Sequence, residues 1–274
     1  TIVDAIASRK TTAGGADPAA APGAAVDPPR PAGSPSGRPA AHGAASASEV
    51  MLLQLVRWRT GAAAWGLSRL VLGPRALGRA PGLLFTRVLG SGRDGGFGLA
   101  PGFDRQGVAA FFADEDSARD YAAQSPALQV RRDHSQECLL LLCRASAARG
   151  SWAGHTMAAT APPAATGELV AALTRASIRP RHARAFWRHT PAAQAALDAA
   201  PGCRLAAGLG EAPLLRQATF SLWDDAASME AFARRGAHRQ ASADATGRDW
   251  FSESMFVRLV PIAMEGTWHG RRFG

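Results

Sequence analysis

Histidine is the side chain in this 274-residue sequence best suited to bind a metal or to carry a proton at neutral pH. We expect no ligand role for the histidines in the N-terminal region or in loop-like and terminal contexts, which are His42, His134, His155 and His269. His182 and His189 stand seven residues apart on one predicted helix, so their rings could share a face. His238 lies in a later predicted helix, where Gly236 would allow a break that turns the imidazole inward. These three are the candidate ligands.

The other reactive side chains match no short catalytic motif. Cys138, Cys143 and Cys203 form no CxxC pair and no set with zinc spacing, so we interpret them as buried thiols in a reducing compartment. The run 90–92 is Gly-Ser-Gly but lacks the Gly-Lys-Ser/Thr ending of a phosphate-binding loop. No Gly-x-Ser-x-Gly elbow occurs. The sequence therefore predicts no zinc site, no nucleotide loop and no serine hydrolase.

The charge balance is basic, with 31 Lys and Arg against 22 Asp and Glu and a net charge of +9. Lys10 is the only lysine. So strong an arginine bias, beside abundant Ala, Gly and Pro, is typical of a GC-rich genome, and we do not take it as a sign of nucleic acid binding. It does favour anionic partners such as phosphates, lipid headgroups, cofactor carboxylates or an acidic redox protein.

The amino-acid composition changes abruptly near Met51, where large apolar residues become frequent. Residues 1–48 are mostly Ala, Pro, Gly and Ser, which bury too little apolar surface to fold, so we expect a disordered tail. The longest strongly apolar run, Cys138–Cys143, is far too short to cross a bilayer. We expect a cytoplasmic protein, with peripheral contact to the inner membrane as a second possibility.

Internal echoes predict a duplicated body. The run Gly-Ser-Trp-Ala-Gly at 150–154 returns as Gly-Thr-Trp-His-Gly at 266–270, 116 residues later. The Gly-x-Gly at 90–92 has an echo at 208–210. Two aromatic or apolar residues followed by acids also recur, at 111–112 and 222–223. Echoes in one order indicate two related halves, 51–155 and 167–270, joined near Pro162-Pro163.

Each half is predicted to run strand, helix, strand, strand, helix, strand. In the second half these elements are expected at residues 168–176, 180–199, 204–209, 217–223, 225–246 and 254–262, with Asp224 or Asp225 as a helix N-cap. This order is the split βαβ unit of ferredoxin-like folds. We therefore predict an α+β protein in which duplicated ferredoxin-like units pack as one barrel, of the dimeric α/β-barrel type, with a cavity for a large flat or long apolar ligand.

A series of ordered blocks extends from about Leu52 to Gly270. They are Pro81–Gly82, Gly90–Gly92, Gly96–Phe97, Leu173–Ala176, Arg179–Ala183, Phe186–Trp187, Gly208–Glu211 with Pro213, Gln217–Trp223, Phe232–Ala233, His238, Arg248, Trp250–Phe251, Glu253, Phe256, Arg258 and Gly266–Trp268. Together these blocks resemble the spheroidene monooxygenase family. Many blocks in order over more than 200 residues are more specific than one short motif.

The resemblance implies an oxygenase of carotenoid biosynthesis. It would introduce a keto group near the end of acyclic carotenoids such as spheroidene, with dioxygen and electrons from a ferredoxin, and family members are regarded as haem proteins. By the resemblance His238 is the expected ligand of the haem iron, with His182 as the alternative. A ligating imidazole usually donates its other nitrogen to a carbonyl or carboxylate, and Asp244 and Glu253 are near enough in sequence. The arginines of the matching blocks that could pair with haem propionates are Arg175, Arg179, Arg248 and Arg258.

Each assignment has an alternative. The four arginines could be solvated, and no residue is assigned a catalytic role. A barrel that binds haem or an apolar ligand without turnover is the second functional class. A basic RNA-binding module is the third, and it is disfavoured because no aromatic-rich RNP-type strand occurs. The stretch Trp58–Arg79 is either a strand and helix packed on the sheet or a basic amphipathic face that contacts a membrane.

Overall fold

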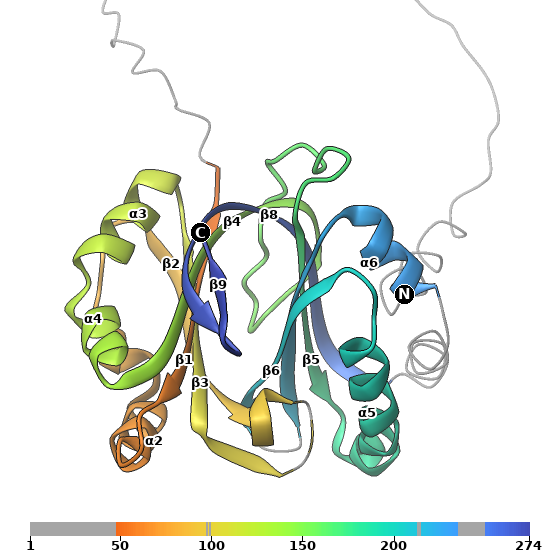
Figure 1. Cartoon of the computed structure of the whole chain (residues 1–274), viewed down its shortest axis with the longest axis horizontal. Coiled ribbons are helices and arrows are strands. Elements are labelled where there is room, and N and C mark those ends of the chain that lie inside the picture. Colours follow the sequence, from red (N-terminus) through yellow and green to blue (C-terminus); the bar gives the residue numbers. More distant parts are fainter. Residues whose placement is uncertain (1–47, 97, 99, 213–214, 235–249) are drawn as a thin grey trace, which may run out of the picture.

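The computed structural model describes residues 48–96, 98, 100–212, 215–234 and 250–274. Its strands form a closed antiparallel barrel with helices outside it (Figure 1). The strands are β1 (Val50–Trp58), β2 (Leu83–Gly92), β3 (Pro101–Phe112), β4 (Ser135–Gly150), β5 (Val170–Ile178), β6 (Cys203–Ala212), β7 (Arg216–Trp223), β8 (Phe251–Trp268) and β9 (Arg271–Phe273). The order around the barrel is β4-β1-β3-β2-β6-β7-β5-β8, and β8 closes the barrel on β4 while β9 extends it. The predicted α+β barrel is confirmed at this level.

Helices cover the outside of the barrel on two sides (Figure 1). They are α2 (Ala63–Leu72), α3 (Glu115–Gln124), α4 (Pro126–Asp133), α5 (Ala183–Asp198) and α6 (Ala226–Ala233), with short 3-10 segments η1 (Gly73–Leu77), η2 (Arg93–Gly95) and η3 (Pro180–His182). Asp114 caps α3 by accepting the Ser117 N–H at 2.8 Å, and Asp225 caps α6 by accepting the Ser228 N–H at 2.7 Å. The Asp225 cap is one of the two that the sequence predicts.

Both faces of the strands are apolar because one face lines the barrel and the other lies under helices. On β1, Met51, Leu53 and Leu55 belong to the cluster that fills the barrel interior, whereas Val50 and Leu52 pack outward with residues of α3 and α4. A third cluster lies between the second half's strands and the helices α5 and α6. The long apolar runs of the sequence are therefore strands buried on two sides.

Strand β8 is longer than the sequence indicates. The expected strand is 254–262, but β8 spans Phe251–Trp268 and pairs with β5 along its first part and with β4 along its second part. Pro261 argues against a continuous strand because it has no N–H for the ladder. The β4–β8 register shifts beside Pro261, and this irregularity accommodates the proline. The expected helix 225–246 is described only for α6, since residues 235–249 lie outside the described part.

The two halves meet at two unequal seams. Strands β4 and β8 pair from Leu139–Gly266 to Gly150–Met255. Strands β2 and β6 pair only at Gly90–Gly210 and Ser91–Leu209, with the Ser91 hydroxyl donating to the Gly208 carbonyl at 2.7 Å. The two Gly-x-Gly echoes of the sequence therefore face each other at the short seam.

Candidate functional site

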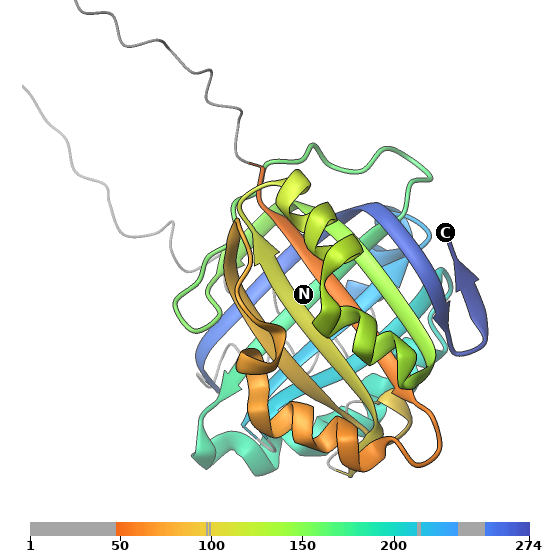
Figure 2. The ribbon, with the colours of Figure 1, turned by 90° about the vertical axis from the view of Figure 1, so that its left-hand side faces the viewer.

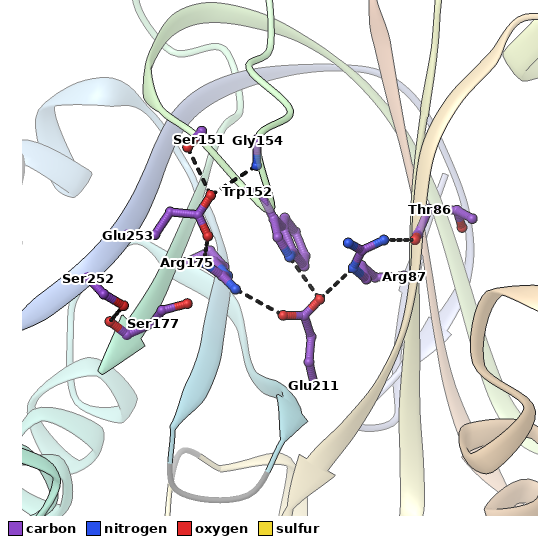
Figure 3. A network of polar contacts seen from close by, with 10 residues as sticks. All are labelled: Thr86, Arg87, Ser151, Trp152, Gly154, Arg175, Ser177, Glu211, Ser252 and Glu253. Atoms are coloured by element: carbon purple, nitrogen blue, oxygen red, sulfur yellow. Dashed lines mark hydrogen bonds and ion pairs between the residues drawn. The ribbon is translucent and has the colours of Figure 1, made fainter. Parts of the chain in front are cut away.

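A mostly buried carboxylate, Glu211 of β6, lies at the centre of a polar network inside the barrel (Figure 3). It accepts hydrogen bonds from Arg87 Nε at 2.6 Å, from Trp152 Nε1 at 3.0 Å and from Arg175 Nη2 at 3.1 Å. Strand alternation places it there, because Leu205, Ala207 and Leu209 of the same strand also face the interior. One carboxylate thus links β2, β5 and the segment after β4 beside the short seam.

Arg175 carries the network to a second carboxylate. Its guanidinium donates through Nη1 to Glu253 at 2.5 Å, and its side chain is only 3% exposed. Glu253 also accepts the Ser151 hydroxyl at 2.9 Å and the Gly154 N–H at 3.1 Å. Burial raises the pKa of Glu253, but these hydrogen bonds and Arg175 together hold it below its usual value. Glu253 is therefore ionised at neutral pH.

The network is balanced in charge, with Arg87 and Arg175 against Glu211 and Glu253 (Figure 3). In a low-dielectric interior such pairs are strongly held, and loss of one partner leaves a buried charge without compensation. Trp152 stands between the two arginines in this view. The network therefore fixes the Gly-Ser-Trp-Ala-Gly segment and the short seam. Two carboxylates compensate the Arg175 charge, while Arg175 Nε has no hydrogen-bond partner among the described residues.

A partly buried imidazole, on His155, continues this site. His155 Nε2 lies 2.7 Å from Glu49 Oε1, and the other oxygen of Glu49 accepts the Ala158 N–H at 2.9 Å. The His155 ring stacks on the Phe85 ring with centroids 5.0 Å apart. The Arg87 guanidinium lies over the Phe85 ring, 4.1 Å from its centroid. No ligand role is expected for His155 from the sequence, because its context is typical of a loop. The signal in the sequence was its position directly after Gly154, at the end of the repeated Gly-Ser-Trp-Ala-Gly segment, whose Trp152 packs inside the barrel.

A second group of candidate ligands lies outside the barrel beside α5. His182 and His189 both pack against Trp250, with ring centroids 6.4 and 5.7 Å away, so the predicted shared face is present. Phe186 lies between them in sequence and also contacts Trp250. The Trp250 Nε1–H is buried and has no hydrogen-bond partner among the described residues. Arg181 Nε donates to His182 Nε2 at 3.0 Å.

The predicted propionate partners do not all come together. Arg179 lies at the α5 side, where its backbone N–H donates to the Trp250 carbonyl at 2.8 Å. Arg258 lies outside the barrel and pairs with Glu230 of α6 at 3.3 Å. Arg175 faces the interior, on the opposite side of the sheet from Arg258. His238, Arg248 and Asp244 lie outside the described residues, and these ligand assignments stay predictions.

Comparison with known proteins gives two kinds of relative. A spheroidene monooxygenase of Rubrivivax gelatinosus is 47% identical over 226 residues, covering 82% of this chain and 87% of that protein. A spheroidene monooxygenase of Rhodobacter capsulatus is 35% identical over 219 residues, covering 77% and 89%. Among solved structures, an aldoxime dehydratase matches with a TM-score of 0.52 at 11% identity, covering 79% of this chain and 82% of that one. Another, in complex with butyraldoxime, matches with a TM-score of 0.51 at 10% identity.

The structural likeness concerns the fold alone, since the identities are so low. No family model matches the chain. The sequence relatives are decisive, because they cover nearly their whole length at high identity. The chain belongs to the spheroidene monooxygenase family and is an oxidoreductase of the monooxygenase kind.

Proposed function

We propose that this monooxygenase acts on an acyclic carotenoid such as spheroidene and introduces a keto group near the end of the polyene. The observation that carries the proposal is the 47% identity to a spheroidene monooxygenase over 87% of its length. One round inserts an oxygen atom from dioxygen into a C–H bond, and two electrons and two protons reduce the other atom to water. A second round at the same carbon gives a hydrate that loses water to form the ketone. A ferredoxin is the proposed electron donor.

Product analysis tests this function. Cells that accumulate an acyclic carotenoid should form its ketone when they express this chain, and the ketone should gain oxygen from labelled dioxygen. A purified sample with reduced ferredoxin, dioxygen and the carotenoid should give the same product. A protein that binds the carotenoid or haem but forms no oxygenated product in either system would instead be the non-catalytic binding barrel.

We further propose haem as the cofactor. Bound haem would supply the iron at which dioxygen is activated. Among the described residues, the group beside α5 combines candidate iron ligands with a polar hydrogen that has no partner, whereas the Arg175 charge inside the barrel is compensated by two carboxylates. Beside α5, His182 is the alternative to the proposed ligand His238, His189 shares its face, and the buried Trp250 N–H suits a carboxylate oxygen. The fit of the described residues favours haem outside the second half's strands.

Ligand substitution tests the haem proposal. His238→Ala is expected to lose haem or to shift the Soret band, while His182→Ala and the first-half control His134→Ala are expected to keep the spectrum. A normal spectrum and normal ketone formation in His238→Ala would transfer the ligand role to His182. Wild-type protein that holds no haem when haem is supplied during expression would refute the cofactor proposal.

We propose peripheral membrane contact through α2, where carotenoids dissolved in the bilayer would be reached. Within the described residues no helix has the length and apolar character to span a membrane. Three large apolar side chains of α2 are nevertheless exposed: Leu67 by 45%, Val71 by 81% and Leu72 by 47%. Co-sedimentation with vesicles should fall for Leu67→Ser/Val71→Ser, and an unchanged sedimented fraction would refute this contact.

We also propose that the two halves are copies of one ferredoxin-like unit. Supporting this, strand order within the halves is β4-β1-β3-β2 and β8-β5-β7-β6. Glu137 accepts the Gly270 N–H at 2.6 Å, and 116 positions later Glu253 accepts the Gly154 N–H. Ala153 and His269, also 116 apart, both have positive φ. An experimental structure whose halves fail to superpose in strand order would refute the duplication.

A further inference from the structure

A cavity of about 750 Å³ lies outside the first half, between α2, η1, α3 and α4. Figure 2 shows these helices on the face turned to the viewer, with α2 below α3 and α4. The lining residues that matter for its chemistry are Trp65, Arg69, Arg75, Arg79, Asp120 and Arg131. Neither the buried network nor the proposed haem ligands belong to this group.

The cavity wall is strongly cationic. Four guanidinium groups line it, on Arg69, Arg75, Arg79 and Arg131, against the single carboxylate of Asp120. Within the described residues none of the four has a carboxylate within 4.0 Å. This contrasts with the network inside the barrel, where every arginine faces a glutamate. The surplus charge favours an anion from outside the chain.

Arg131 makes the case specific. Its residue is 2% exposed, and its guanidinium donates through Nε to Gln54 Oε1 at 3.2 Å and through Nη2 to Gln106 Oε1 at 3.4 Å. It also lies over the Trp58 ring at 5.1 Å. All these partners are neutral. Burial, with a smaller contribution from Arg69, lowers the pKa of Arg131 to about 10, which still leaves it charged at neutral pH.

The amide partners hold the buried guanidinium in place. Gln54 Nε2 donates to the Leu128 carbonyl at 3.1 Å, and Gln106 Nε2 donates to the Gly66 carbonyl at 2.7 Å. Both amides are therefore oriented with their oxygens toward Arg131. A buried charge that meets only neutral acceptors is costly unless an anion joins it. The fold thus fixes a cation at the cavity wall and leaves its countercharge to be supplied.

Part of the remaining wall is apolar, beside the polar Ser117, Gln124 and Ser125. Trp65, Leu77, Pro81 and Val130 line the cavity, and Val130 is 41% exposed. The exposed Leu67 and Val71 belong to α2, the same helix that carries Trp65 and Arg69. A ligand with an anionic group and an adjoining apolar chain could pair with the arginines and also pack against the apolar side chains. An inorganic anion could pair with the arginines but would leave the apolar side chains without a contact.

We propose that this cavity binds the phosphate headgroup of an anionic phospholipid, with Arg75 and Arg79 at its mouth and Arg131 at its base. The proposal rests on the membrane contact of α2 and adds lipid selectivity to it. Apolar residues of α2 would enter the bilayer surface while the arginines hold one headgroup. The enzyme would then bind preferentially to membranes rich in anionic lipid, in which the apolar carotenoid is dissolved.

The test uses the full chain and flotation with phosphatidylcholine vesicles, with and without phosphatidylglycerol. Wild type should bind the anionic vesicles more tightly. Arg75→Gln/Arg79→Gln should weaken this binding at least about tenfold, because each basic residue near an anionic surface contributes roughly a factor of five. The control Arg216→Gln/Arg272→Gln removes the same charge from exposed positions away from the cavity and should weaken binding by less than about threefold.

Calorimetry separates the site from the membrane contact. Monomeric dihexanoyl-phosphatidylglycerol should bind wild type and bind Arg131→Met at least about tenfold more weakly, while inorganic phosphate should compete poorly. Equal vesicle binding by the cavity and control variants would overturn the site and leave the membrane contact standing. Monomer binding without vesicle binding would refute the membrane contact alone. Inorganic phosphate binding as tightly as the lipid monomer would overturn the lipid assignment.

Discussion

Replacing Glu211 with glutamine tests whether the buried network holds the barrel together. The substitution removes one negative charge while keeping nearly the same shape. Glu211 receives hydrogen bonds from Arg87, Trp152 and Arg175, and its side chain is 11% exposed. The glutamine amide can accept only at its oxygen, and its NH₂ group would face a guanidinium. Among the described residues, Arg175, at 3% exposed, would keep only the Glu253 carboxylate, and Arg87 would keep none.

The expected cost follows from burial. Breaking a buried ion pair costs about 3–5 kcal/mol, and a hydrogen bond to a charged group is worth about 1.5–3 kcal/mol. Arg87 is 28% exposed and regains water, which reduces its share. We expect Glu211→Gln to lower the free energy of unfolding by about 3 kcal/mol. For a domain of this size that corresponds to roughly 6–12 °C in melting temperature.

Urea unfolding followed by circular dichroism measures this change, with Glu230→Gln as the matched control. Glu230 also faces two arginines, Arg234 and Arg258, each at 3.3 Å, but its side chain is 39% exposed. Its loss should cost less than about 1 kcal/mol. If Glu211→Gln were no less stable than Glu230→Gln, the network would contribute nothing beyond surface charge and the reasoning would fail.

Four further predictions concern stability and reactivity. Burial raises the pKa of Glu253, but the Gly154 N–H, the Ser151 hydroxyl and Arg175 hold it below its usual 4.5. Its stabilisation is therefore present above that pH and lost as the pH falls through the lowered value, and Glu253→Gln should flatten the acid side of the urea-midpoint profile. Burial raises the pKa of Cys143 to about 12 and that of Cys203 to about 11, so a thiol reagent at neutral pH should label the unfolded chain much faster than the native one. Gly150→Ala and Gly266→Ala should each destabilise more than Gly154→Ala by urea titration, because all three have positive φ but only the first two place a Cβ against a strand carbonyl. Removal of residues 1–48 should leave the melting temperature unchanged, and a drop of several degrees would show that this segment contributes to stability.

The order of elements follows from the sequence, because apolar runs and Gly or Pro punctuation are local signals. The structure adds a second helix between β3 and β4, since Ser125 and Pro126 begin α4 directly after α3. The length of β8 could not be predicted in this way. Its second part is a strand because it has β4 as a partner, and that pairing joins residues more than 100 positions apart.

The buried network shows a second limit of prediction from sequence, which is the pairing of residues that lie far apart in the chain. Arg175, Glu211 and Glu253 all fall in blocks that resemble the family, yet their partners in space come from β2 and from the segment after β4. Ion pairs between distant strands leave no spacing pattern in one sequence. The same holds for His155, whose partner Glu49 is 106 positions away. Sequence reasoning could find candidate residue types, while their pairing required the barrel.

The arginines inside the barrel and those on its outer face differ in whether a carboxylate of the described residues compensates their charge. Inside, each arginine of the network meets a glutamate, so these charges stabilise the chain itself, although Arg175 Nε and Trp268 Nε1 are buried without a partner among the described residues. Outside, Arg131 is held by amides alone, and the buried Trp250 N–H lacks a partner among the described residues. Unmet polar groups of this kind are costly unless a ligand satisfies them. The guanidinium that no carboxylate compensates, on Arg131, therefore lies on a helix-covered outer face, where we place the lipid, while the closed barrel holds its two outer faces in a fixed relation.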